Sequence, residues 1–119
     1  MQIEIQEIKG AKIAMVITDS IAIKDVEDAV DILGNSYYLG ASKIIIKKEN
    51  ILPQFFDLKT KIAGEVLQKF SNYNAKLAIV GDFSEFTSKS LKDFIYESNK
   101  NGMINFVNTM EEAKERLLK

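Results

Sequence analysis

The sequence of 119 residues contains no cysteine and no histidine. Without cysteine, the chain has no disulfide, no thiolate nucleophile and no thiolate metal site. Without histidine, it lacks the usual general base near neutral pH and the commonest protein ligand for transition metals. A Ser-His-Asp mechanism is therefore excluded. The glycine-rich phosphate-binding patterns GxGxxG and GxxxxGK[ST] are also absent. We expect no catalytic residues, no metal and no cofactor.

The chain also lacks an excess of either charge, because 16 Lys+Arg residues oppose 17 Asp+Glu residues and leave a net charge of −1. Nucleic acids and anionic membranes attract proteins that carry a marked positive charge. We therefore expect neither as a partner. No apolar run is long enough to cross a bilayer, and the start MQIEIQEIKG alternates instead of forming a signal-peptide centre. The expected location is the cytoplasm.

The clearest pattern in the chain lies between Ser42 and Phe70. Three consecutive isoleucines, Ile44 to Ile46, are typical of a strand that is covered on both faces. The only proline, Pro53, then marks a loop. Beyond the loop, apolar residues recur at helical spacing: Ile62, Ala63, Val66, Leu67, Phe70 and Tyr73. We expect a buried strand, a loop and an amphipathic helix.

The rest of the chain continues this alternation of strands and helices. Two strands joined by a turn at Lys9-Gly10 should form a hairpin over residues 3–17, and a helix should begin near Asp25. Strands are expected at 77–80 and 104–107, and helices at 88–100 and after Thr109, which with Glu112 forms a capping box. The order is β-β-α-β-α-β-α-β-α, in a single domain over 1–119. Such repeated strand-helix units predict an α/β fold with a mostly parallel sheet, opened by an antiparallel hairpin.

Two adjacent tyrosines, Tyr37 and Tyr38, lie near the end of the first predicted helix. Neighbouring side chains on a helix point about 100° apart. One ring should therefore lie in the core and the other at the periphery. The pair could form an interaction surface or a homodimer contact, and the sequence leaves both alternatives open.

This order of elements resembles the STAS fold of anti-sigma-factor antagonists. In that family the second helix follows a strand and a short Asp-Ser motif, whose serine is phosphorylated by a partner kinase. Phe56-Asp57 resembles the start of that motif, but Leu58 stands in place of the serine. The resemblance therefore implies a STAS-like fold in which only the aspartate of the motif is present. Thr60 lies one turn further along and is a substitute acceptor only by hypothesis.

A second resemblance covers nearly the whole chain. The strings FFDLKT, GEVLQKFSNY, KLAIVGDFS and SKSLKDFIYESN are similar to a bacterial family of domains of unknown function. This resemblance implies no particular activity.

The candidate site lies where loops follow two inner strands, because such loops gather at one edge of a parallel sheet. One loop contains Phe55-Phe56-Asp57 and the other runs from Asp82 to Thr87. The rings could form a recognition patch for a protein partner, or they could tuck beneath helix starts as hydrophobic staples. The predicted surface comprises Phe55, Phe56, Asp57, Thr60, Asp82, Phe83, Ser84 and Phe86.

The two aspartates of this surface, Asp57 and Asp82, allow a second interpretation. Carboxylates can hold magnesium or exchange protons, but magnesium sites normally cluster several carboxylates, and Glu49 is the one further candidate. Capping of helix N-termini explains both aspartates more simply. We therefore expect no metal ligand among them.

Three functional hypotheses follow. The leading one is a cytoplasmic, non-catalytic STAS-like regulatory domain that binds an unidentified protein through this edge. The alternative is a small-molecule binder or weak enzyme in which Asp57 and Asp82 orient a polar ligand. The third is a phosphorylation switch at Thr60 or Ser84, acting through added negative charge near a helix N-terminus.

Overall fold

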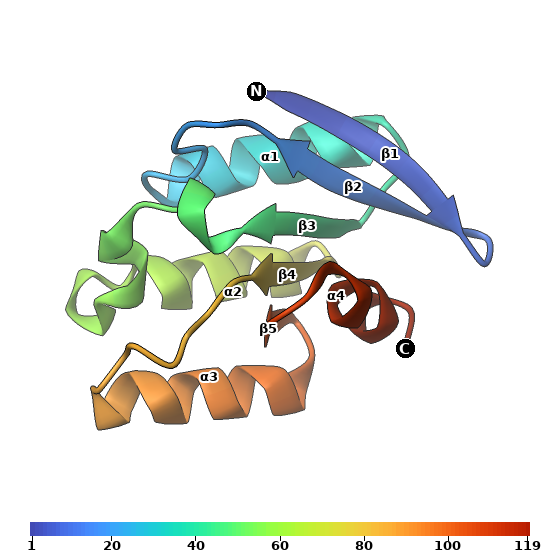
Figure 1. Ribbon diagram of the computed structural model, residues 1–119. Helices are drawn as coiled ribbons and strands as arrows, with labels where there is room; N and C mark the ends of the chain where they lie inside the picture. Colours follow the sequence, from blue (N-terminus) through green and yellow to red (C-terminus); the bar gives the residue numbers. More distant parts are fainter.

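The computed structural model describes all residues from Met1 to Lys119 and has the predicted order of strands and helices (Figure 1). The strands are β1 (Gln2–Ile8), β2 (Ala11–Ile17), β3 (Lys43–Lys47), β4 (Lys76–Val80) and β5 (Ile104–Val107). The α-helices are α1 (Val26–Tyr38), α2 (Ile62–Asn72), α3 (Lys89–Asn101) and α4 (Met110–Leu117). Three short 3₁₀ turns connect β3 to α2, namely η1 (Lys48–Asn50), η2 (Pro53–Phe56) and η3 (Leu58–Thr60).

The five strands form one sheet in the order β1-β2-β3-β4-β5. β1 and β2 pair antiparallel, with Ile5 opposite Ala14, and the other neighbours pair parallel. Ile44, Ile45 and Ile46 of the central strand β3 lie beside Leu77, Ala78 and Ile79 of β4. The predicted α/β fold, a mostly parallel sheet opened by an antiparallel hairpin, is confirmed.

The helices cover the two faces of the sheet unequally. α1, α2 and α3 lie on one face and α4 lies on the other (Figure 1). Successive residues of a strand point to opposite faces, so Ile44 and Ile46 pack into the larger core with the three helices. Ile45 packs on the other side with Ala113 and Leu117 of α4. The triple-isoleucine strand is therefore buried on both faces, as its composition predicts.

Most helix ends lie where local sequence signals place them. The Asp25 carboxylate accepts a hydrogen bond of 2.9 Å from the Asp28 N–H and begins α1. Ser88 and Thr109 cap α3 and α4 in the same way. Gly102 follows α3 with φ +88°, a left-handed conformation that glycine adopts without strain. These boundaries depend on interactions within a few residues, so the sequence predicts them well.

The core positions predicted for one ring of the Tyr37-Tyr38 pair and for Tyr73 are wrong, whereas Tyr38 has the peripheral position predicted for the other ring of the pair. Tyr37 is 41% exposed and Tyr38 is 91% exposed, so neither ring lies in the core. The residue of this turn that points inward is Ser36, which is fully buried. Tyr73 is 52% exposed. It is the C-cap residue that follows α2, so it lies beyond the last residue of the helix whose inner face is buried. Tyr37 instead lies beside Tyr73, with ring centroids 6.3 Å apart and its hydroxyl donating to the Tyr73 carbonyl.

The outer edge of β5 is closed by a side chain. The Asn99 amide of α3 donates to the Phe106 carbonyl at 3.2 Å and accepts from the Phe106 N–H at 2.7 Å. These are the two bonds that another strand would make with this residue. Arg116 of α4 in turn donates to the Asn99 carbonyl at 3.0 Å. Asn99 thus occupies the edge of β5, whereas β1 lies at the opposite edge of the sheet.

Candidate functional site

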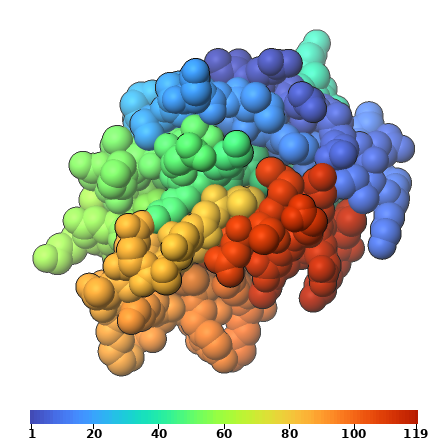
Figure 2. All heavy atoms as spheres, in the orientation of Figure 1, coloured from blue at the N-terminus to red at the C-terminus, as the bar shows by residue number.

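The segments that follow β3 and β4 meet at the carboxyl edge of these strands. Figure 2 shows the gold loop after β4 at the surface, against the green segment that follows β3. The Lys48 ammonium of η1 donates to the Asp82 carbonyl of that loop at 2.7 Å. Residues 48–60 and 81–88 therefore form one continuous region, in which all the predicted site residues lie.

The phenylalanines of this region form an aromatic cluster, which we define as Phe56, Phe83, Phe86 and Phe106. The Phe56 ring stacks on Phe86 with centroids 5.0 Å apart, and Phe83 meets Phe106 edge to face at 5.3 Å. Phe83 and Phe86 remain partly exposed, whereas Phe56 is 8% exposed. Phe55, beside the cluster, is 1% exposed. Phe55 and Phe56 thus belong to the core, which corrects their predicted place on an accessible surface.

Asp57 and Thr60 organise the turn that leads into α2. The Asp57 carboxylate accepts from the Lys59 N–H at 3.1 Å, so it caps the short turn η3 and not α2. The Thr60 hydroxyl lies 2.8 Å from the Asp57 carbonyl and 2.9 Å from the Gln54 carbonyl. It also accepts from the Ile62 N–H at 3.3 Å, in the first turn of α2. Phosphorylation of Thr60 would replace its hydroxyl proton, so the side chain could no longer donate hydrogen bonds to the Asp57 and Gln54 carbonyls.

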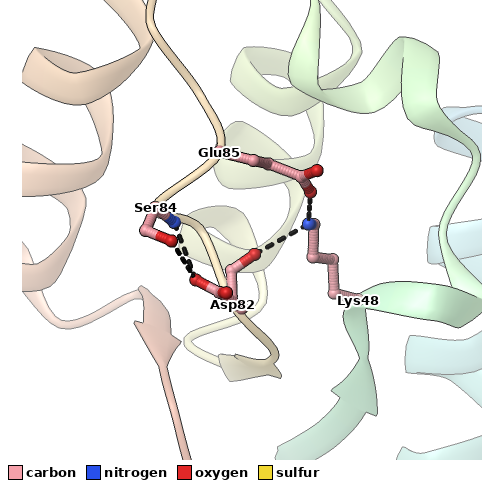
Figure 3. Close-up of polar contacts among 4 residues, drawn as sticks. All are labelled: Lys48, Asp82, Ser84 and Glu85. Atoms are coloured by element: carbon pink, nitrogen blue, oxygen red, sulfur yellow. Dashed lines mark hydrogen bonds and ion pairs between the residues drawn. The ribbon is translucent and has the colours of Figure 1, made fainter.

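Asp82 forms a closed turn with Ser84, and both are labelled in Figure 3. Its carboxylate accepts from the Ser84 hydroxyl at 2.6 Å and from the Ser84 N–H at 2.9 Å. Helix α3 begins only after its own cap, Ser88, so the predicted role of Asp82 as a helix cap is wrong. The bonds from the Ser84 side chain and backbone, with a smaller contribution from the Lys48 charge, hold the Asp82 pKa below its ordinary value.

Replacing Ser84 by alanine should therefore raise the Asp82 pKa towards its ordinary value, because the larger of the two bonds from Ser84 is lost. A depressed carboxyl pKa adds stability above the unfolded-state pKa, and this stability is lost as the pH falls through the folded-state pKa. The variant should thus lose less stability than the wild type on acidification through that range. Carboxyl carbon chemical shifts followed by NMR would give the pKa. Ser90→Ala, at an exposed serine of α3, is the control, and an unchanged Asp82 pKa in Ser84→Ala would contradict the assignment.

Lys48 is the residue of this region that sequence reasoning missed. Its side chain is 21% exposed, and its ammonium pairs with Glu85 as well as with the Asp82 carbonyl (Figure 3). The same ammonium lies 4.9 Å from the centroid of Phe86 and 5.8 Å from that of Phe83. The available signal was its position directly after β3, at the carboxyl edge of a strand whose three isoleucines are buried.

A half-open pocket of about 570 Å³ lies beside Lys48. Its apolar wall contains Ile21, Ile51, Pro53, Phe56 and Phe86, and its charged groups are Lys48, Glu49 and Glu85. Asp57 and Asp82 do not line it. No group of three or more acidic side chains is placed to hold a metal ion. The polar chemistry of the pocket is therefore one ammonium and two carboxylates beside an apolar wall.

None of the helices combines the length and the apolar composition that a bilayer span requires.

Comparisons with known proteins agree with the fold. Residues 8–117 match the family model described as "Domain of unknown function (DUF4180)". No curated protein has a matching sequence. The crystal structure of a Thermotoga maritima protein, assigned as an anti-sigma factor antagonist, superposes with a TM-score of 0.51. The superposition covers 98% of this chain and 95% of that chain at 12% sequence identity, so the likeness shows a shared STAS-like fold and nothing about function.

Proposed function

Since the chain belongs to the DUF4180 family and has a STAS-like fold, we propose that it is a non-catalytic regulatory domain that binds another protein in the cytoplasm. The fold is that of a structure assigned as an anti-sigma factor antagonist, a kind of protein whose name implies a protein partner. The contact surface is the carboxyl edge of β3 and β4.

The observation that carries this proposal is the partly exposed aromatic surface at that edge. Phe83 and Phe86 present ring surface to solvent while their inner sides pack on the buried Phe56. Aromatic side chains that are already held in place lose little conformational entropy on binding and are frequent anchors of protein interfaces. Lys48 lies over both rings and pairs with Glu85, and the exposed Asp57 directly follows Phe56 in the chain, so charged groups adjoin the aromatic surface as in the polar rim of such an interface.

Partner capture from the native host's lysate tests the proposal. The edge variant Lys59→Glu/Thr87→Glu places two acidic side chains at exposed positions of the proposed surface. The control Lys69→Glu/Ser71→Glu makes the same change of charge at exposed positions of α2. We expect the edge variant to recover at least tenfold less of a specific protein by mass spectrometry, and the control to recover the wild-type amount.

Both variants should first be shown to be folded by circular dichroism. Equal loss from the two variants would mean that net charge, and not this edge, governs capture. Equal retention by both would remove the edge as the contact surface.

A further inference from the structure

We propose that the pocket beside Lys48 binds a partner segment in which an acidic side chain is adjacent to an apolar one. The partner carboxylate would replace that of Glu85 on the Lys48 ammonium, and the apolar side chain would lie against Ile21, Ile51 and Pro53. The inference rests on the proposed function and adds the chemistry of the partner.

The Lys48 ammonium is held in place before any partner arrives. The chain after β4 passes so close that a Cβ on Gly81 would lie 2.5 Å from the Lys48 Cβ, so only glycine fits there without a shift. The ammonium is then fixed by the Asp82 carbonyl at 2.7 Å and lies over the Phe86 ring. A cation that is already ordered and largely shielded from water binds a carboxylate at a smaller entropic cost than a free surface lysine does.

Glu85, by contrast, is held only loosely. Its side chain is 65% exposed, and it belongs to a loop without helix or strand structure between β4 and α3. An ion pair whose carboxylate is this exposed contributes little to stability. The Glu85 carboxylate therefore occupies an anion position from which another carboxylate can displace it.

The chain itself shows which chemistry suits this position. Glu85 and Phe86 are an acidic residue followed by an apolar one, and both contact Lys48, the first by an ion pair and the second through its ring face. A partner segment of the same kind would repeat the ion pair and place its apolar side chain in the adjoining pocket. The pocket is half open, which suits an inserted side chain better than a small molecule that must be mostly enclosed.

The charges in the pocket predict that removing one carboxylate strengthens the binding of an acidic segment. One ammonium faces two carboxylates in the pocket, Glu49 and Glu85, and only Glu85 pairs with it. Removing the Glu85 charge should free Lys48 and strengthen binding of an acidic segment. Removing the Glu49 charge alters the net charge equally but leaves the Lys48 ion pair in place, so its effect should be smaller.

The experiment is an NMR titration of the ¹⁵N-labelled full chain with two peptides, acetyl-Gly-Leu-Glu-Leu-Gly-amide and its Gln counterpart. We expect saturable amide shifts around Lys48 and Glu85, with the Glu peptide binding at least fivefold more tightly than the Gln peptide. Glu85→Gln should increase the affinity for the Glu peptide at least threefold, and this increase should be larger than that caused by Glu49→Gln. Lys48→Gln should abolish the preference for the Glu peptide, provided that its spectrum shows an intact fold.

Three results would overturn the inference. These are no saturable shift up to about 10 mM peptide, equal binding of the two peptides, and an effect of Glu85→Gln no larger than that of Glu49→Gln. A third probe, hexanoate, separates the sources of a carboxylate, since tighter binding of hexanoate than of the Glu peptide would assign the pocket to a small molecule. The proposed function is tested separately by lysate capture, so failure of the peptides alone would leave it standing.

Discussion

Phe56→Ala lowers the free energy of unfolding by about 3–5 kcal/mol, the usual cost of truncating a buried phenylalanine to alanine. Phe56 is only 8% exposed and contacts all three other rings of the aromatic cluster as well as Phe55. Its removal leaves a cavity at the junction of η2, the loop after β4 and β5. Urea denaturation followed by circular dichroism would measure the change.

The matched control is Tyr96→Ala, at an aromatic residue of α3 that is 65% exposed, where we expect a change within about 0.5 kcal/mol. A cost below about 1 kcal/mol for Phe56→Ala would show that the surrounding rings are not closely packed. The expected cost also means that charged substitutions at Phe56 would unfold the chain before they tested partner binding, which is why the capture experiment changes exposed residues.

Gly81→Ala is expected to destabilise the fold by about 1–3 kcal/mol through overpacking. The new Cβ would lie 2.5 Å from the Lys48 Cβ and 3.0 Å from its Cδ. A Cβ is fixed to its backbone, so rotation of the lysine side chain cannot relieve the first contact. The end of β3 must shift, and the Lys48 ammonium should move away from the Asp82 carbonyl.

Two variants isolate this steric cause in the same urea measurement. Gly64→Ala, in α2, adds a Cβ that meets nothing within 4 Å, and alanine's higher helix propensity should stabilise the chain by about 0.5–1 kcal/mol. In a Lys48→Gly background the Cβ contact disappears, so the cost of Gly81→Ala should fall to near zero. An equal cost in both backgrounds would refute the close approach of the two segments.

The parts of the fold that the sequence predicts are those decided by short-range interactions. These interactions join residues that are close together in the sequence. They are the alternation in β1 and β2, the isoleucine run of β3, and the helix caps Asp25, Ser88 and Thr109. The apolar residues of each strand and helix also lie on the side of that element that faces a core. Once the strand order β1-β2-β3-β4-β5 is known, the right-handed crossover rule places α1, α2 and α3 on the same face of the sheet.

The candidate site was harder to predict because its contacts join residues far apart in the sequence. Lys48 meets Asp82 across 34 positions, and Phe56 meets Phe106 across 50. A pair of phenylalanines before an aspartate looks the same in the sequence whether the rings face solvent or a second loop. Only the approach of the β4 loop, which Gly81 permits, decides that Phe56 is buried and that Lys48 is fixed.

The amide of Asn99 also limits how copies of this chain could join. Because the Phe106 backbone is already bonded to Asn99, a further strand beside β5 would first have to displace that amide, whereas a strand added beside β1 would not. Two copies that paired through their β1 edges would form a ten-stranded sheet ending in a blocked strand on each side. Sheet extension through the β1 edges alone would stop at such a symmetric pair, so the Asn99 amide opposes the continued edge-to-edge pairing that a filament requires.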